Sequence, residues 1–177
     1  LMPTNSSFEE AAAVPTGGLE ALHFLRKANI HGRPGQELLI NGAGGSIGTF
    51  GVQLARHFGA EVTAVDSTEK LDMLRSIGAN KVVDYTQEDF SQSGETYDVI
   101  FDVVGKSPFT GSIKSLKPNG YYLIANPSLS KMIRGAWASR NSSKKVIFDA
   151  AGRKREDLLF LKALFEAGTI KTVIDRR

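Results

Sequence analysis

Gly42-Ala43-Gly44-Gly45-Ser46-Ile47-Gly48 is the stretch that decides the expected fold of this chain. It follows a short apolar run and precedes an amphipathic stretch with helical spacing, so it joins a strand to a helix. Gly42 supplies the tight turn out of the strand, Gly45 lets the backbone approach a ligand, and Gly48 lets the helix pack closely. A glycine loop in this position is typical of a site for the pyrophosphate of a dinucleotide.

The first turn of that helix also favours an anionic ligand. The backbone N–H groups of Ser46, Ile47 and Gly48 have no acceptor inside the helix and lie at the positive end of its dipole. A P-loop would need a lysine before the hydroxyl residue, and Gly48-Thr49 lacks it. A methyltransferase has a similar loop, but usually a shorter one, and needs a seventh, antiparallel strand that the C-terminal sequence does not indicate.

An acidic residue, Asp66, follows the next apolar run. It lies 18 residues after Gly48, close to the ~20 expected for the acid that binds the adenosine ribose hydroxyls. A carboxylate there favours NAD because it repels a 2′-phosphate, whereas Ser67, Thr68 and Lys70 could bind that phosphate. The alternative interpretation is that Asp66-Ser67 only caps the next helix.

Apolar runs alternate with helical stretches along the rest of the chain. This pattern predicts a parallel sheet covered by helices on both faces. Right-handed crossovers then give an α/β fold of Rossmann type, a doubly wound parallel six-stranded sheet in the order 3-2-1-4-5-6. The expected strands are 37–41, 61–65, 81–85, 97–104, 121–125 and 145–148, and the expected helices are 47–58, 68–77, 109–116, 129–140 and 156–167.

Two further helices are expected before the first strand. The spacing of apolar residues predicts helices over 6–13 and 18–28, with Pro15 ending the first. Residues 1–35 are therefore expected to be leading helices from a domain junction, and 36–177 the NAD(P)-binding domain. Met132 and Trp137 are expected to belong to a packing face of a later helix.

Composition limits the class of protein. The chain has 177 residues, with 41% hydrophobic and 23% charged, which suits one globular domain. Without a secretory signal or an apolar run of about 18 residues, no membrane association and a cytoplasmic location are expected. The net charge of +3 is dispersed apart from a short basic cluster at 153–155, so no nucleic acid is expected as a partner. Leu1 is not an initiator methionine, which suggests a piece of a longer chain.

The sequence resembles the medium-chain dehydrogenase/reductase superfamily, and within it the zinc-independent quinone oxidoreductase branch, whose nucleotide-binding domain is alcohol dehydrogenase-like. The similarity covers almost the whole chain. It is carried by Ala11-Ala12-Ala13-Val14-Pro15, Leu39 to Gly48, Val52-Gln53-Leu54-Ala55, Phe58-Gly59-Ala60, Gly78-Ala79, Val83-Asp84-Tyr85, Asp98 to Asp102, and Gly120.

The resemblance implies roles for several residues around the cofactor. Lys70 and Tyr85 match positions that contact the 2′-phosphate in NADP-using members. Val104 and Gly105 match positions near the nicotinamide ribose, and Ala125 and Asn126 match positions beside the nicotinamide. Asp66 departs from the pattern of NADP-preferring members, which commonly have a small residue there. NADP(H) is therefore only slightly favoured over NAD(H).

The resemblance also implies what the whole protein does. A separate catalytic domain, GroES-like in this superfamily, is missing from this chain and would complete the cleft for a small-molecule substrate. Hydride would pass between NAD(P)H and a quinone, an enone, or a carbonyl or alcohol, so the chain would belong to an oxidoreductase and be inactive alone. Zinc is not expected, because relatives that bind it have a cysteine near Thr16 and this chain has no cysteine.

Other questions stay open on the sequence alone. Catalytic residues are not identified, because His23, His31 and His57 are scattered and form no acid–base constellation. The alternative function is a non-catalytic NAD(P)-sensing or interaction module, which the fold does not distinguish from an enzyme domain. A homodimer is expected through a sheet edge, with 145–148 as the candidate strand.

Overall fold

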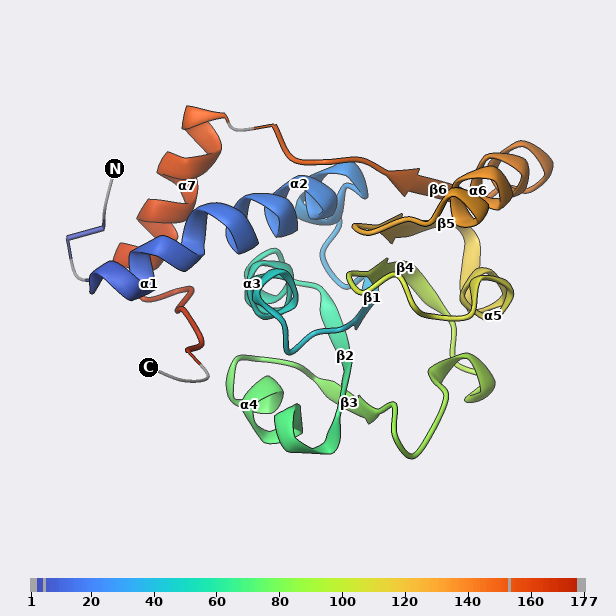
Figure 1. Cartoon of the computed structure of the whole chain (residues 1–177), viewed down its shortest axis with the longest axis horizontal. Helices are drawn as coiled ribbons and strands as arrows, with labels where there is room; N and C mark the ends of the chain where they lie inside the picture. Colours follow the sequence, from blue (N-terminus) through green and yellow to red (C-terminus); the bar gives the residue numbers. More distant parts are fainter. Residues whose placement is uncertain (1–2, 5, 153, 175–177) are drawn as a thin grey trace.

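A computed structural model describes residues 3–4, 6–152 and 154–174 and contains one six-stranded sheet (Figure 1). All strand pairs are parallel, and the order is β3-β2-β1-β4-β5-β6, so the predicted fold class and strand order are confirmed. The strands are β1 (Glu37–Asn41), β2 (Glu61–Asp66), β3 (Lys81–Asp84), β4 (Tyr97–Asp102), β5 (Leu116–Ile124) and β6 (Lys145–Phe148).

Two apolar cores lie on opposite faces of the sheet, because successive side chains of a buried strand point to opposite sides. Leu38 and Ile40 of β1 belong to one core, and Leu39 belongs to the other. The first core holds α2 (Leu19–Lys27), α3 (Ser46–His57), α4 (Leu71–Ser76) and α7 (Arg155–Glu166), and the second holds α5 (Phe109–Lys114) and α6 (Leu129–Asn141).

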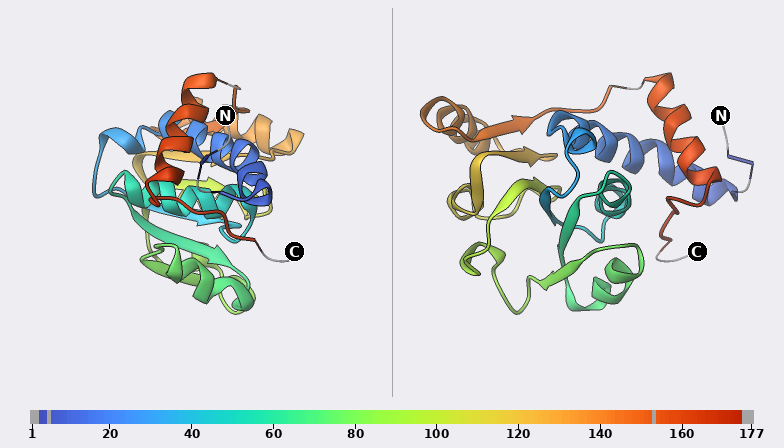
Figure 2. Two further views of the ribbon diagram at one scale, coloured as in Figure 1. Left: turned by 90° about the vertical axis from the view of Figure 1, so that its left-hand side faces the viewer. Right: turned by 180° about the vertical axis from the view of Figure 1, so that it is seen from behind.

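The N-terminal helices form one continuous helical segment, so the prediction that Pro15 ends a helix is wrong. The helix α1 (Phe8–Ala13) passes through a π-helical turn, η1 (Val14–Gly18), directly into α2. Proline has no N–H to donate, and the wider π-helical turn accommodates it without interrupting the helical segment. Figure 2 shows α7 crossing this segment on one side of the molecule.

Gly17 brings this segment close to the glycine loop. A Cβ built on Gly17 would lie 2.6 Å from the carbonyl oxygen of Ser46, so only glycine allows this approach. The part of the predicted leading segment around Gly17 is therefore packed against the start of α3.

Strand bounds differ from expectation by more than one residue in β4 and β5. β4 ends at Asp102, two residues early, and β5 begins at Leu116 with Pro118-Asn119-Gly120 inside it. The 118–120 segment is a local irregularity at which Asn119 adopts a positive φ of 62°, and the pairing of β5 with β4 shifts register between Tyr97 and Val99.

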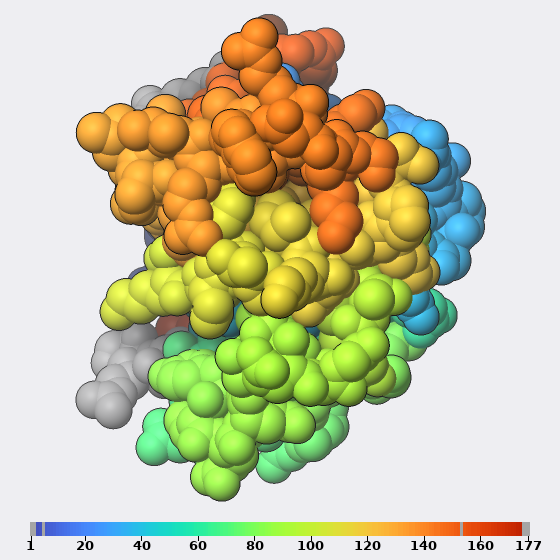
Figure 3. Space-filling model, turned by 90° about the vertical axis from the view of Figure 1, so that its right-hand side faces the viewer, coloured from blue at the N-terminus to red at the C-terminus, as the bar shows by residue number. Residues whose placement is uncertain are grey.

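The helix α6 packs through small residues, and the prediction for Trp137 is wrong. Gly135 and Ala138 are buried, and a Cβ on Gly135 would lie 2.8 Å from Val146 Cγ1 of β6. Trp137 is on the outer side and is 70% exposed, and Met132 is also exposed. Figure 3 shows α6 projecting from this side of the molecule.

The sequence predicts two surface properties, a short basic cluster at 153–155 and no association with a membrane. Arg153 of the basic cluster lies outside the described residues, and Arg155 begins α7. None of the helices in the described part of the chain has the length and apolarity that crossing a membrane requires.

Candidate functional site

The candidate site is a cavity of about 640 Å³ at the carboxyl ends of the central strands. The strand order reverses between β1 and β4, and such a reversal opens a crevice between the loops that follow the two strands. Six of the predicted site residues line this cavity: Gly42, Gly45, Asp66, Lys70, Tyr85 and Val104.

The glycine loop has the geometry that its spacing predicts. Gly42 has a φ of +82°, and a Cβ there would lie 2.2 Å from Val104 Cγ2. A Cβ on Gly48 would lie 2.4 Å from the carbonyl oxygen of Gly42, so the start of α3 packs directly on the loop. At Gly45 the nearest atom to an added Cβ is 3.6 Å away, which leaves the backbone open toward the cavity.

Asp66 and Lys70 hold the two backbone groups of one loop residue, Gly44. The Asp66 carboxylate accepts hydrogen bonds from Gly44 N–H at 2.7 Å and from Ser67 N–H at 2.9 Å. The ammonium of Lys70 donates to the Gly44 carbonyl oxygen at 3.2 Å. Ser67 is the N-cap of η3 (Thr68–Lys70), but no side chain makes a capping hydrogen bond there, so the capping alternative is not what the geometry favours.

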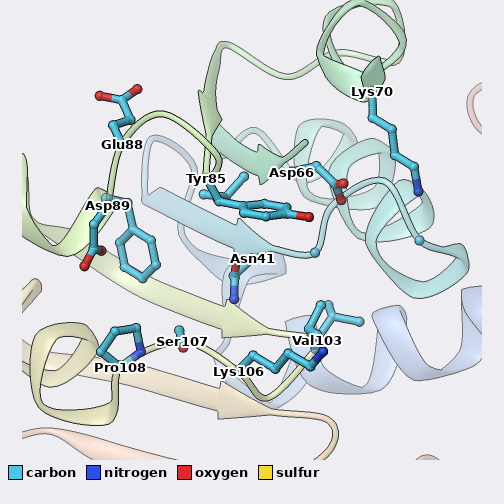
Figure 4. A pocket seen from close by; sticks show the side chains of 15 residues that line it. Asn41, Asp66, Lys70, Tyr85, Glu88, Asp89, Val103, Lys106, Ser107 and Pro108 are labelled. Carbon is cyan, nitrogen blue, oxygen red and sulfur yellow. The ribbon is translucent and has the colours of Figure 1, made fainter. Parts of the chain in front are cut away.

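The opposite wall comes mainly from residues that the sequence did not single out, although Val104 lies in the same loop. Figure 4 shows Val103, Lys106 and Ser107 facing Asp66, Lys70 and Tyr85 across the cavity, with Asn41 between them. Nothing in the spacing of these loop residues marks them as lining residues, since they meet only through the sheet topology. The wall residues missed from the sequence are Asn41, Val65, Glu88, Asp89, Phe90, Val103, Lys106, Ser107 and Pro108.

The remaining predicted residues lie outside the cavity wall: Ser46, Ile47, Gly48, Ser67, Gly105, Ala125 and Asn126. Two of them shape the wall indirectly. Asn126 Nδ2 donates to the Val103 carbonyl oxygen at 2.8 Å. Gly105 has a φ of +71°, and a Cβ there would lie 2.2 Å from the Asn126 carbonyl oxygen.

A buried carboxylate, Asp102, ends β4 behind this wall and was missed from the sequence. Its Oδ1 accepts from Asn41 Nδ2 and Gly105 N–H, both at 2.9 Å. Its Oδ2 accepts from Ser107 Oγ at 2.6 Å and Tyr122 OH at 2.9 Å, and lies 3.2 Å from Lys131 Nζ.

The hydrogen-bond donors around Asp102 favour the ionised form of its carboxyl group. Burial acts to raise the pKa of Asp102, but hydrogen bonds from Ser107 and Asn41 and the charge of Lys131 outweigh it and lower that pKa. Burial and the adjacent carboxylate raise the pKa of Tyr122. Asp102 therefore stays ionised and Tyr122 stays protonated at neutral pH.

The described cavity wall contains no histidine. His23 Nε2 instead lies 3.2 Å from Asp149 Oδ2 on the surface. Among the described residues, no group of three or more His, Cys, Asp or Glu side chains is placed to hold a metal ion.

Comparison with known proteins gives concordant matches. Residues 46–132 match the family model described as zinc-binding dehydrogenase. The chain is 33% identical over 177 residues to 2-methylene-furan-3-one reductase of Solanum lycopersicum, covering 99% of this chain and 41% of that protein. It is 38% identical over 128 residues to the chloroplastic NADPH-dependent alkenal/one oxidoreductase of Arabidopsis thaliana, covering 68% of this chain and 31% of that protein.

The fold also matches solved structures. The quinone oxidoreductase of Coxiella burnetii superposes with a TM-score of 0.88 at 27% identity, covering 98% of this chain and 54% of that chain. This chain thus spans about half the length, or less, of the relatives that it matches.

Proposed function

Because this chain belongs to the medium-chain dehydrogenase/reductase superfamily, we propose that it is the NAD(P)-binding domain of an oxidoreductase. The proposed substrate is a quinone, an enone, or a carbonyl or alcohol. The observation that carries the proposal is the glycine-lined cavity at the reversal of strand order, with the first turn of α3 at its edge. The alternative of a non-catalytic module has no support among the relatives named above, which are all reductases or oxidoreductases.

The residues of the cavity fit a dinucleotide. Gly45 leaves backbone space where a side chain would exclude a phosphate, and α3 begins there with N–H groups that have no acceptor inside the helix. We propose that Gly42, Gly45, Ser46, Ile47 and Gly48 hold the pyrophosphate. We propose further that Val104, Gly105, Ala125 and Asn126 shape the nicotinamide end, directly or through the 103–107 backbone.

The proposed preference is for NADP(H). Lys70 and Tyr85 both line the cavity, and Tyr85 is 61% exposed, so its ring is free to contact a ligand. Asp66 opposes this preference by its charge, but both of its oxygens already accept backbone N–H groups, from Gly44 and Ser67. The partial positive charges of these N–H groups offset part of the negative potential of Asp66, so it repels a 2′-phosphate less than a carboxylate without such partners.

A bound nicotinamide dinucleotide supplies the hydride chemistry, and the residues of this chain supply binding and orientation. We propose that 36–177 form the cofactor-binding domain and 1–35 lead into it from a GroES-like catalytic domain elsewhere in the parent protein. Zinc is not expected in this chain, since it has no cysteine. A cytoplasmic location stays a prediction, because the related alkenal/one oxidoreductase is chloroplastic.

A homodimer through β6 is the proposed assembly. β6 lies at one edge of the sheet and pairs only with β5 among the described strands, so its outer edge lacks a strand partner, although Val146 N–H donates to Ser139 Oγ at 2.9 Å. Light scattering at high protein concentration should give twice the monomer mass. A monomeric mass throughout would contradict this proposal for the chain.

The function is tested by following the absorbance of NADPH with a quinone and with an enone. The parent protein should oxidise NADPH with at least one of them, and this chain alone should bind NADPH without oxidising it. A parent protein that binds NADPH but oxidises it with none of the proposed substrates would favour the sensing module instead.

A further inference from the structure

Residues 103–108 form part of the cavity wall, and Lys131 of α6 donates hydrogen bonds to their backbone. Val103, Val104, Lys106, Ser107 and Pro108 of this segment line the cavity. The ammonium of Lys131 donates to the carbonyl oxygens of Gly105 and Ser107, both at 2.8 Å. Its third contact is Asp102 Oδ2 at 3.2 Å.

These three contacts use every N–H of the ammonium group. The side chain of Lys131 is only 12% exposed, and its partner Asp102 is completely buried. Lys131 therefore has no donor left for a ligand, and its charge is neutralised within the protein.

The position of Lys131 in its helix is unfavourable by local rules. It lies in the first turn of α6, three residues after the N-cap Ser128, where the helix dipole disfavours a cation. A local conflict of this kind is expected where a tertiary interaction or a function compensates for it. Here the compensation is the contact with Asp102 and the two loop carbonyls.

The rest of the 103–107 segment depends on the same cluster. Asp102 accepts from Gly105 N–H at 2.9 Å and from Ser107 Oγ at 2.6 Å. The buried Asp102–Lys131 pair thus holds both backbone groups of Gly105: Asp102 accepts from its N–H, and Lys131 donates to its carbonyl oxygen.

We propose that Lys131 is a positioning residue for the cofactor site: it fixes the 103–107 backbone in the shape that the dinucleotide binds. This inference rests on the proposed function. α6 is itself anchored on β6 through Gly135 and Ala138, so Lys131 connects the wall to a packed helix.

The test compares calorimetric NADPH binding by the wild-type chain, Lys131→Met and Lys144→Met. Lys144 is a matched control, because its ammonium also donates to a backbone carbonyl, that of Ile113, away from the cavity wall. Lys131→Met should raise the Kd for NADPH at least about tenfold, equivalent to about 1.4 kcal/mol, and Lys144→Met should not. Amide exchange at Gly105 should accelerate in Lys131→Met alone.

A second variant separates positioning from stability. Lys131→Met leaves the buried Asp102 carboxylate without a counter-ion, and Lys131→Met/Asp102→Asn removes that unpaired charge, so thermal stability should recover toward the wild-type value. NADPH binding should stay weak, because the Gly105 and Ser107 carbonyls still lack their donor. Recovery of wild-type affinity in the double variant, or unchanged affinity in Lys131→Met, would overturn the inference alone. A wild-type chain that binds neither NADPH nor NADH would overturn the proposed function, and the inference with it.

Discussion

The Asp66 carboxylate accepts a hydrogen bond from the Gly44 N–H at 2.7 Å, so the acid that ends β2 braces the glycine loop that follows β1. The same carboxylate lines the cavity next to Lys70. It therefore has both a structural role in the loop and an electrostatic influence on the choice between NADH and NADPH.

Replacing this acid with its amide separates the two roles. Asp66→Asn retains an oxygen that can accept from Gly44 N–H but removes the negative charge. The ratio of NADPH to NADH affinity should rise by at least about tenfold, measured by calorimetry. Asp72→Asn is the control, because Asp72 is an exposed acid of α4 that does not line the cavity. An unchanged ratio in Asp66→Asn would show that the carboxylate does not influence cofactor choice.

Lys70→Ala removes a cation that contacts the glycine loop. Because the Lys70 ammonium lies 3.2 Å from the Gly44 carbonyl and lines the cavity, NADPH affinity should fall by about tenfold and NADH affinity much less. Lys114→Ala, at the exposed end of α5, should change neither. Equal losses for both dinucleotides would argue against a contact between Lys70 and the 2′-phosphate.

Two glycines of the loop should respond differently to alanine. Gly48→Ala places a Cβ 2.4 Å from the Gly42 carbonyl oxygen, and such overpacking should destabilise the chain by about 1–3 kcal/mol in thermal melts. Gly45→Ala has 3.6 Å of clearance and should melt like the wild type but bind NADPH weakly. Normal NADPH affinity in Gly45→Ala would remove this glycine from the proposed phosphate site.

The stabilising effect of Asp102 should depend on pH. The pKa of Asp102 is lowered in the folded chain, because hydrogen bonds and Lys131 outweigh the effect of burial. Its contribution is therefore present above the unfolded pKa of about 3.9 and is lost as pH falls through the lower folded pKa. In urea denaturation, the stability difference between wild type and Asp102→Asn should shrink as pH is lowered below about 4. Asp72→Asn serves as the exposed control, and a difference that grows in acid would contradict the account.

The sequence allowed the glycine loop and the strand order to be predicted because both follow from local rules. Gly42 and Gly48 have the spacing at which a side chain would collide with the loop, and this requirement appears directly in the chain. The alternation of apolar strands with helices restricts the sheet to few topologies. Lys70 and Tyr85 were found through family resemblance, and both line the cavity.

The Asp102 cluster could not be predicted because its members meet only in three dimensions. Lys131 is 29 residues from Asp102 in sequence, and Tyr122 reaches the same carboxylate from the neighbouring strand. A lysine in the first turn of a helix was the only local signal. The continuation past Pro15 was missed for a related reason, because a π-helical turn depends on packing that no local propensity encodes.

The central claim, that this chain binds a nicotinamide dinucleotide in the glycine-lined cavity, is tested most directly by calorimetric titration with NADPH and, separately, NADH. The account predicts saturable binding of one molecule per chain, tighter for NADPH, and weakened by Gly45→Ala without loss of folding. No binding of either dinucleotide to the folded chain, or binding that Gly45→Ala leaves unchanged, would contradict it.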